Sequence, residues 1–307
     1  MASCPSMVIN LSPLLLGAMS VLLVFPLSTV AWGHPNRNHH HGWASFQNLS
    51  GCALGETRPA LADLKRYLHH FGYLSDVSAA RDKDNFTDYF DAELESALIT
   101  YQKFFNLNVT GRLDASTLDL ITSPRCGVPD VVVHVNSTAT DDRRRSLYSY
   151  FPGRPVWPYY KRQLSYKFVS PAIAPVRGLF NRAFTRWSRV TPLSFLEIGR
   201  GYADITIAFT GMDGPGGTLA YAYAPTNGRM LVDLSENWWV QRGALSQYSD
   251  QYDLESVVVH EIGHLLGLDH SRVWEAIMFP QIPPRTRKVD LSNDDLQGIW
   301  GLYGRRF

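Results

Sequence analysis

The apolar residues of this chain follow two different periods, one in each half. From Pro59 to Leu74 and from Leu94 to Phe105 they recur every three or four residues, which predicts two amphipathic helices, and a third short helix is expected over 115–121. Beyond residue 160, apolar and polar residues alternate instead. This alternation predicts strands at 164–168, 205–209, 219–223 and 230–232.

The change of period predicts an α+β chain in two domains. We expect a small three-helix domain over 59–135 and an α+β domain over 151–307. The helices of the second domain are expected at 176–187, 254–266 and 293–302. Residues 136–150 include Asp-Asp-Arg-Arg-Arg, and we expect an exposed linker there that a protease could cut.

The amino end of the chain has the pattern of a secretory signal. An apolar stretch runs from Val8 to Val30, is interrupted by Pro13 and Pro26, and is followed by small residues near Ala31. We therefore expect residues 1–31 to be a signal peptide, although no Lys or Arg precedes the apolar stretch. The alternative, an uncleaved membrane anchor, agrees less well with the prolines and the small-residue boundary.

Charge and the chain ends limit the partners. The formal net charge is +1, which argues against a charge-driven nucleic-acid binder. Residues 32–58 begin with a polar run that includes His39–His41, and we expect a flexible segment there. The last residues are not apolar, so no lipid anchor is expected. These features together predict a secreted, extracellular protein without a membrane anchor, which we expect to be a monomer.

Glycosylation signals and cysteines agree with a secreted chain. Four N-x-Ser/Thr sequons lie in the first half, at Asn48, Asn85, Asn108 and Asn136. Such sequons matter only in a chain that enters the secretory pathway, so they predict a glycoprotein. Cys4 would leave with the signal peptide. Cys52 and Cys126 could pair with each other, or Cys52 could remain an unpaired thiol.

The chemistry of the chain is concentrated in one segment that begins with His260, Glu261 and His264 and continues through Gly267 to His270. Residues four apart on a helix share one face, so the first two histidines can direct their ring nitrogens at one ion. The glycine can end the helix and turn the chain, which brings the last histidine back as a third ligand. The alternative is a buried helix whose histidines are only hydrogen-bonded, and the glycine and the third histidine make it less favoured.

Three protein ligands leave the fourth tetrahedral position of a zinc ion open, as in catalytic rather than structural sites. Such an ion lowers the pKa of its water toward ~7 and polarises a peptide carbonyl. Glu261 lies one residue from the first ligand, so it can take a proton from that water without coordinating the metal. The segment therefore predicts a zinc hydrolase.

With these residues the chain resembles the metzincin metallopeptidases and, within them, the matrix metalloproteinase family. Ser271 follows the third histidine as in that family, and Ala276–Pro280 is similar to its Met-turn, with Met278 beneath the zinc histidines. Pro124–Asp130 is similar to its cysteine-switch motif. The resemblance is strongest to plant members without a hemopexin-like domain. It implies a twisted mixed sheet with three helices, preceded by a helical propeptide.

The resemblance also implies the activity. The expected function is a latent endopeptidase that cuts internal peptide bonds of extracellular proteins, in the cell wall or apoplast if the source is a plant. The Cys126 thiolate would hold the fourth zinc position until an activating protease removes the propeptide, and Arg125 and Asp130 would pair to shape the loop. The alternative from another class is a non-catalytic secreted binding protein on the same fold.

Further family features concern substrate and calcium. The resemblance implies an edge strand at Leu219 and Ala220 that pairs with an extended substrate, a pocket wall at Pro280 and Ile282, and a pocket mouth at Ser256. It also implies a calcium site of carboxylate and carbonyl oxygens, although an acidic turn without metal remains an alternative. Its expected ligands are Asp213, Gly214, Gly216, Thr218, Asp233 and Glu236.

One departure from the family concerns a second, structural zinc. Two of the positions that hold a zinc-binding histidine in the family correspond to Tyr221 and Leu231 here. After Cys126 the chain has only four histidines, at 134, 260, 264 and 270. Neither a phenol nor an aliphatic side chain replaces imidazole as a zinc ligand. We therefore expect one catalytic zinc ion and no structural zinc.

Overall fold

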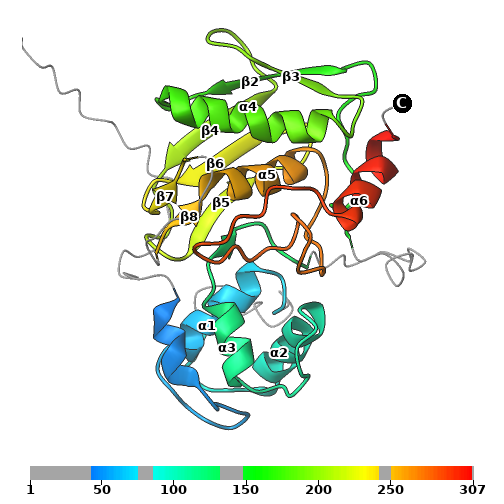
Figure 1. The fold of residues 1–307 in the computed structure, drawn as a ribbon. Helices are drawn as coiled ribbons and strands as arrows, with labels where there is room; N and C mark the ends of the chain where they lie inside the picture. Colours follow the sequence, from blue (N-terminus) through cyan, green and yellow to red (C-terminus); the bar gives the residue numbers. More distant parts are fainter. Residues whose placement is uncertain (1–42, 75–85, 132–147, 242–249, 306–307) are drawn as a thin grey trace, which may run out of the picture. The chain divides into compact units, whose positions relative to one another are not determined.

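The computed structural model describes residues 43–74, 86–131, 148–241 and 250–305 (Figure 1). The expected signal peptide, His39–His41, Asn85, Asn136 and most of the expected linker lie outside these residues. In the part of the chain that is described, no helix is long and apolar enough to cross a membrane.

A helical domain occupies residues 43–131. Its elements are the 3-10 helix η1 (Ala44–Leu49) and the helices α1 (Leu61–His70), α2 (Ala92–Phe104) and α3 (Ala115–Ile121). The Asp91 carboxylate accepts a hydrogen bond from the Leu94 amide and so begins α2, and Asp114 begins α3 in the same way at Thr117. All three predicted helices are confirmed, and their apolar faces meet in one core.

The start of this domain differs from the prediction that residues 32–58 are a flexible segment. Phe46, Leu49 and Cys52 are buried in the core of the helical domain, so residues 43–58 are part of it. The backbone of this segment is tied to the domain, because the Gly51 amide donates to the Leu113 carbonyl. A helix of six residues is too short to show a period in sequence, which is why the prediction placed the boundary too late.

The second domain contains a mixed sheet. Its strands are β2 (Gln163–Phe168), β3 (Ser194–Glu197), β4 (Ile205–Thr210), β5 (Thr218–Ala222) and β6 (Arg229–Asp233). The order β1-β5-β6-β4-β2-β3 includes β1 (Arg125–Cys126), which comes from the end of the helical domain. Only the β5–β6 pair is antiparallel. The short strands β7 (Trp238–Trp239) and β8 (Tyr252–Asp253) form a separate pair.

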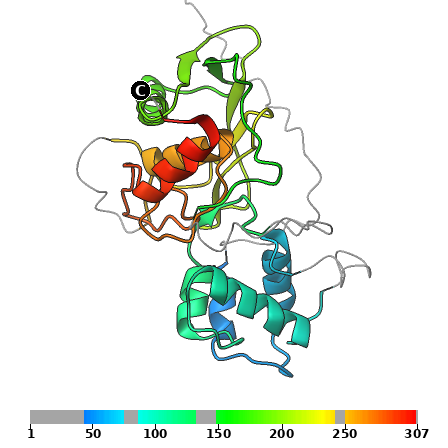
Figure 2. The ribbon, with the colours of Figure 1, turned by 90° about the vertical axis from the view of Figure 1, so that its right-hand side faces the viewer.

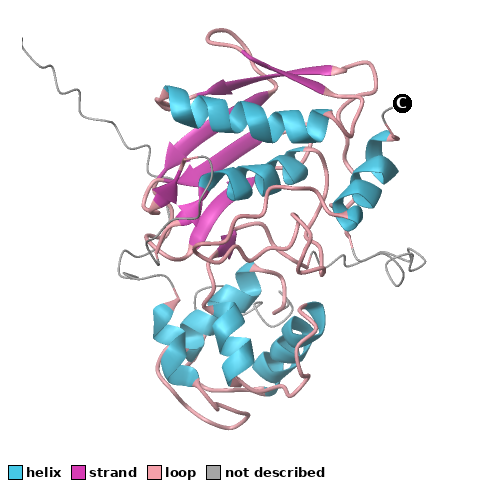
Figure 3. Ribbon diagram, in the orientation of Figure 1, coloured by secondary structure: helices cyan, strands magenta, loops and turns pink. Residues whose placement is uncertain are grey.

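The described part of this domain also contains three helices, in agreement with the α+β prediction. They are α4 (Ala174–Ser188), α5 (Leu254–Leu265) and α6 (Asn293–Tyr303). Helices α4 and α5 lie on the same side of the sheet (Figure 3), as the view turned by 90° also shows (Figure 2). The Trp187 indole of α4 is buried and donates to the Val259 carbonyl of α5 at 2.9 Å, which fixes the two helices together.

Some elements of this domain were not predicted. The pattern of β3 alternates between exposed and half-buried residues, so it lacks the buried positions that mark a strand. The domain also begins before residue 151. The Ser149 hydroxyl donates to the His270 carbonyl at 2.6 Å, and the Tyr150 hydroxyl donates to the Gly298 carbonyl at 2.9 Å. Residues 148–150 of the expected linker therefore belong to the second domain.

Candidate metal centre

Helix α5 carries the first two candidate ligands. The Asp253 carboxylate accepts from the Ser256 amide and begins the helix, and every residue from Leu254 to Leu265 is buried. Gly263 is required on this helix, because a Cβ atom there would lie 2.2 Å from the Met278 sulfur. Met278 thus lies directly against the helix, as the sequence motif predicted. After the helix, Gly267 has a φ of +100° and turns the chain back toward His270.

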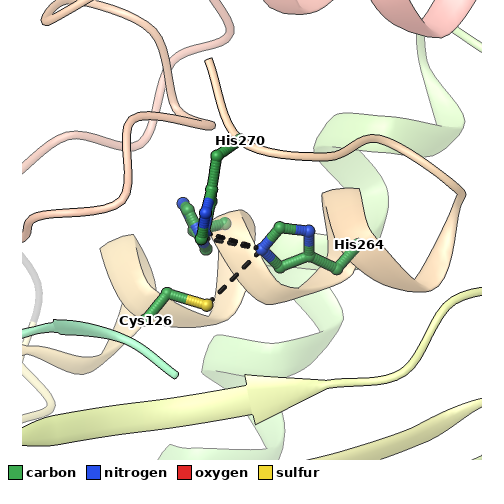
Figure 4. Close-up of side chains that lie close together, drawn as sticks. Cys126, His264 and His270 are labelled. Atoms are coloured by element: carbon green, nitrogen blue, oxygen red, sulfur yellow. Dashed lines mark hydrogen bonds between the residues drawn. The ribbon is translucent and has the colours of Figure 1, made fainter. Parts of the chain in front are cut away.

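Four side chains converge at one point. The Nε2 atom of His264 lies 3.1 Å from that of His260, 3.2 Å from that of His270 and 3.4 Å from the Cys126 sulfur (Figure 4). All four residues are completely buried, and their ligand atoms lie within 4.8 Å of one another. Among the described residues this is the one group of three or more His, Cys, Asp or Glu side chains that meets this limit.

The outer ring nitrogens determine what this cluster can hold. The His260 Nδ1 atom lies 2.7 Å from the Ile277 carbonyl, and the His264 Nδ1 atom lies 2.8 Å from the Leu268 carbonyl. The His270 Nδ1 atom lies 2.7 Å from an Asp130 carboxylate oxygen. Carbonyl and carboxylate oxygens only accept, so each Nδ1 carries the ring proton. Burial lowers the pKa of all three imidazoles, which keeps them neutral.

Three unprotonated Nε2 atoms therefore face one another and cannot hydrogen-bond among themselves. Such lone pairs are satisfied by a shared cation. In tetrahedral zinc, with Zn–N distances of about 2.0–2.1 Å, neighbouring nitrogens lie about 3.3–3.4 Å apart. The two close nitrogen pairs agree with that spacing to within a few tenths of an ångström. The residues present therefore fit a zinc ion with three imidazole ligands and one sulfur ligand.

Cys126 reaches the cluster from the helical domain. The Val128 amide donates to its sulfur at 3.4 Å, as in loops that stabilise thiolates. Burial and the nearby Glu261 carboxylate raise the pKa of the thiol. A cation held by the three imidazoles would act in the opposite direction and favour the thiolate. Cys126 and Cys52 are both free thiols, so the pairing left open by the sequence is not formed.

Glu261 lies beside the cluster and is not one of its ligands. Its side chain is buried, and neither carboxylate oxygen has a partner within hydrogen-bond geometry in the described part of the chain. Burial raises the pKa of Glu261 to about 8, while the adjacent Cys126 thiol opposes this shift. A carboxyl group with its pKa near neutrality can both accept and return a proton.

The switch segment, Pro124–Asp130, lies between the two predicted substrate-binding segments, one at Leu219 and Ala220 and the other at Pro280 and Ile282. On one side, the Arg125 amide donates to the Gly217 carbonyl and the Gly127 amide donates to the Ala220 carbonyl, at 3.2 and 2.8 Å. On the other side, the Cys126 amide donates to the Pro280 carbonyl and the Ile282 amide donates to the Pro124 carbonyl, both at 3.0 Å. Leu219 is buried next to these contacts. The helical domain thus occupies the backbone positions expected to bind a peptide.

Ser256 makes its side-chain hydrogen bonds at the start of α5. Its hydroxyl donates to Asp253 and accepts from the Lys288 amide, so it contributes to the start of α5. Its side chain is buried, and its role at a pocket mouth remains a prediction.

The expected calcium residues form an acidic cluster. Backbone amides of Thr218, Ser235 and Gly216 donate to Asp213, Asp233 and Glu236 respectively. One oxygen of Asp233 and one of Glu236 remain buried and unpartnered among the described residues. Burial, together with the neighbouring Asp233 and Asp213, raises the pKa of Glu236 to about 7. Gly214 and Gly216 adopt positive φ in the same loop. Among the described residues the three carboxylates do not converge as the histidine cluster does, and calcium remains a prediction.

The residues expected to replace the structural zinc ligands face each other. Tyr221 on β5 is directly opposite Leu231 on β6, and both are half-buried. The Tyr221 ring also contacts Tyr223, with 4.8 Å between centroids. The absence of a structural zinc remains a prediction. Two predicted glycosylation sites, Asn48 and Asn108, are exposed.

Sequence reasoning missed the connections between the candidate ligands and the helical domain. Asp130 was expected to pair with Arg125, and it does so, but it also contacts His270. Although burial alone would raise the pKa of Asp130, Arg125 and His270 lower it to about 2. The Arg125 guanidinium also lies over the Phe71 ring, 3.7 Å from its centroid. No local pattern signals contacts between residues so far apart in sequence.

Known proteins match both domains. Residues 157–304 match the matrixin family, and residues 57–121 match a family described as a putative peptidoglycan binding domain. The chain is 45% identical over 283 residues to Metalloendoproteinase 5-MMP of Arabidopsis thaliana, which spans 86% of this chain and 76% of that protein. It is 44% identical over 263 residues to Metalloendoproteinase 1 of Glycine max, which spans 81% of this chain and 84% of that protein.

A more distant relative, Stromelysin-1 of Rattus norvegicus, is 36% identical over 259 residues, which span 78% of this chain and 49% of that protein. The resemblance inferred from the sequence motifs is confirmed by these matches, and the helical domain corresponds to the propeptide. The chain therefore belongs to the matrixin family of zinc metalloendopeptidases.

Proposed function

We propose that this protein is a secreted, latent endopeptidase in which His260, His264 and His270 hold a single catalytic zinc ion. The observation that carries the proposal is the convergence of three Nε2 atoms with the Cys126 sulfur in a completely buried site, where each Nδ1 atom lies against an oxygen acceptor. A hydrogen-bonded histidine cluster without metal would leave the Nε2 lone pairs facing one another, which is unfavourable in a buried site.

Glu261 is proposed as the general base and acid. A zinc ion in this position would supply a Lewis acid that activates water and polarises the peptide carbonyl. The carboxylate of Glu261 accepts the proton of the attacking water and returns it to the leaving amine. Its burial and lack of hydrogen-bond partners among the described residues leave both oxygens available for this transfer.

Substrate binding would use the backbone groups that the switch segment occupies in the latent form. Once β1 leaves, β5 becomes the edge of the sheet, and Ala220 and Pro280 present free carbonyls on either side of the groove. An extended peptide can pair with such an edge through its backbone, as in other strand-addition complexes. Backbone pairing of this kind favours polypeptide substrates over small esters or amides.

Latency would depend on Cys126 and on the contacts of the switch segment. Cutting by another protease between the two domains would release both. The sequons and the amino-terminal pattern support secretion and extracellular protein substrates. The acidic cluster at Asp213, Asp233 and Glu236 supports a calcium ion that stabilises the loop before β5.

The test is the Glu261→Gln variant of the propeptide-free protein, with Glu275→Gln on the exposed surface as the control. We expect hydrolysis of a quenched peptide to fall by at least about a hundredfold in Glu261→Gln, because general acid–base catalysis contributes about that much or more. Zinc content should not change, because Glu261 is not a ligand. Substantial turnover by the zinc-loaded variant would refute the assignment.

A further inference from the structure

The Asp130 carboxylate connects the two domains through three hydrogen-bond donors. It accepts hydrogen bonds from the Arg125 guanidinium, from the Tyr73 hydroxyl at 2.6 Å and from the His270 Nδ1 atom at 2.7 Å. The side chains of Asp130 and His270 are both completely inaccessible to solvent. Asp130 and Tyr73 belong to the propeptide domain, whereas His270 is the third candidate ligand of the zinc site.

The direction of the bond to His270 follows from the partners of Asp130. A carboxylate paired with a buried guanidinium is ionised and has no proton to donate. His270 therefore donates from Nδ1, and its Nε2 lone pair faces His264. The carboxylate thus fixes both the tautomer and the orientation of this ring, as carboxylate partners of metal-bound histidines do elsewhere.

The other two imidazoles are held differently. His260 donates from Nδ1 to the Ile277 carbonyl, and His264 donates to the Leu268 carbonyl. Both carbonyls belong to the catalytic domain and remain after the propeptide is removed. Only His270 has a partner that is charged and that leaves with the propeptide.

We propose that Asp130 is a positioning residue of the latent zinc site. It holds the His270 ring in the orientation that binds the metal, so the proenzyme binds zinc more tightly than it would with the Cys126 sulfur as the only propeptide contribution. This inference rests on the proposed zinc site. Removal of the propeptide then breaks two connections to the metal centre, the direct one through Cys126 and an indirect one from Asp130 through His270. The cysteine-switch motif therefore contacts the ligand His270 through Asp130, as well as the fourth coordination position through Cys126.

The size of the effect follows from similar sites. Loss of a hydrogen-bond partner behind a metal-bound histidine typically costs about 10- to 100-fold in metal affinity. Asp130→Asn is the sharpest single change, because it preserves the shape of the side chain and removes the charge. It also leaves the buried Arg125 guanidinium without its anion, which alone could loosen the propeptide.

A second pair of variants removes that complication. In Arg125→Met we expect the Asp130 carboxylate to keep the bonds to Tyr73 and His270 that it makes in the wild type. In Arg125→Met/Asp130→Asn no buried guanidinium is left unpaired. These two proteins differ only at Asp130. Tyr73→Phe is the matched control, because it removes a propeptide hydrogen bond to Asp130 without touching His270.

The experiment uses the zinc-loaded, full-length proenzyme and has two readouts. One is the rate of zinc transfer to an excess of a chromogenic chelator. The other is the NMR signals of the three imidazole Nδ1–H protons, in which His260 and His264 serve as internal references. We expect zinc release to be about 10- to 100-fold faster in each Asp130→Asn protein than in its parent, with little change in Tyr73→Phe. Only the His270 signal should shift strongly.

Two results would overturn the inference. The first is unchanged zinc release with all three ring signals unmoved. The second is faster release with equal shifts of all three signals, because that pattern means that the whole propeptide has moved away from the site. A wild-type proenzyme that binds no zinc would contradict the proposed function instead, so the two failures are distinguishable.

Discussion

Glu255 provides a test of how the start of the ligand helix is held. Its carboxylate lies in the first turn of α5 with a side-chain exposure of 1%, and it accepts from Arg182 at 2.8 Å, Arg287 at 3.0 Å and Arg186 at 3.3 Å. Burial alone would raise the pKa of Glu255, but the hydrogen bonds and charges of Arg182 and Arg287 lower it from its ordinary value of 4.5 to about 2.

The lowered pKa of Glu255 determines how much its ionised carboxylate stabilises the fold and how that stability changes with pH. At about 1.4 kcal/mol per pKa unit the lowering corresponds to at most about 3 kcal/mol of stability, and the partly exposed arginines reduce this to about 2–3 kcal/mol. Because the folded pKa is the lower one, this stability is fully present above pH 4.5. It is lost as the pH falls from 4.5 toward about 2. We therefore expect Glu255→Gln to lower the free energy of unfolding by about 2–3 kcal/mol at about pH 7.

The assay is urea unfolding of the wild type and the variant between about pH 7 and pH 3, with excess chelator in both so that metal release at low pH does not enter. The difference in unfolding free energy should shrink steadily below pH 4.5. Glu197→Gln is the control, because its pair with Arg177 is partly exposed and should contribute less than about 1 kcal/mol. A Glu255→Gln difference that is the same at both ends of this pH range would refute the reasoning.

Three other predictions follow from the site. Cys126→Ser should make the full-length protein cleave a quenched peptide without propeptide removal, whereas the control Cys52→Ala should stay latent. Equal latency in both variants would mean that packing of the propeptide alone blocks substrate binding. Gly263→Ala should destabilise the protein by about 1–3 kcal/mol in urea unfolding, because its Cβ would collide with Met278. The control Gly178→Ala, on the exposed side of α4, should be neutral or stabilising, and an unchanged stability of Gly263→Ala would contradict the packing of Met278 against α5. Elemental analysis of calcium-saturated, propeptide-free protein should give one zinc per chain, since Tyr221 and Leu231 cannot ligate, and a value near two would show a second site.

Features that depend on neighbours in sequence were predictable. The helical period of residues 61–70 indicated α1, and the spacing of His260, His264 and His270 alone indicated the ligand set. The same spacing placed Glu261 beside the ligands without making it one of them. In each case the relevant residues lie no more than ten positions apart in the sequence.

Features that depend on distant contacts were not predictable. Asp130 and His270 are 140 residues apart, and no periodicity relates them. The strand β1 exists only because Arg125 and Cys126 pair with β5, so two residues that carry no strand pattern become part of the sheet. Phe279 belongs to the Met-turn in sequence but is buried in the core of the propeptide domain, with 5.7 Å between its ring centroid and that of Phe105. Such contacts are set by tertiary packing.

The proposed chemistry depends above all on a zinc ion held by the histidines. The most direct measurement is the zinc content, by elemental analysis, of the purified full-length wild type and of its His264→Ala variant. His264 lies closest to the other ligand atoms, so its removal should empty the site. We predict about one zinc ion per chain in the wild type and almost none in the variant. Equal zinc in the two proteins would contradict the assignment of the metal to this cluster.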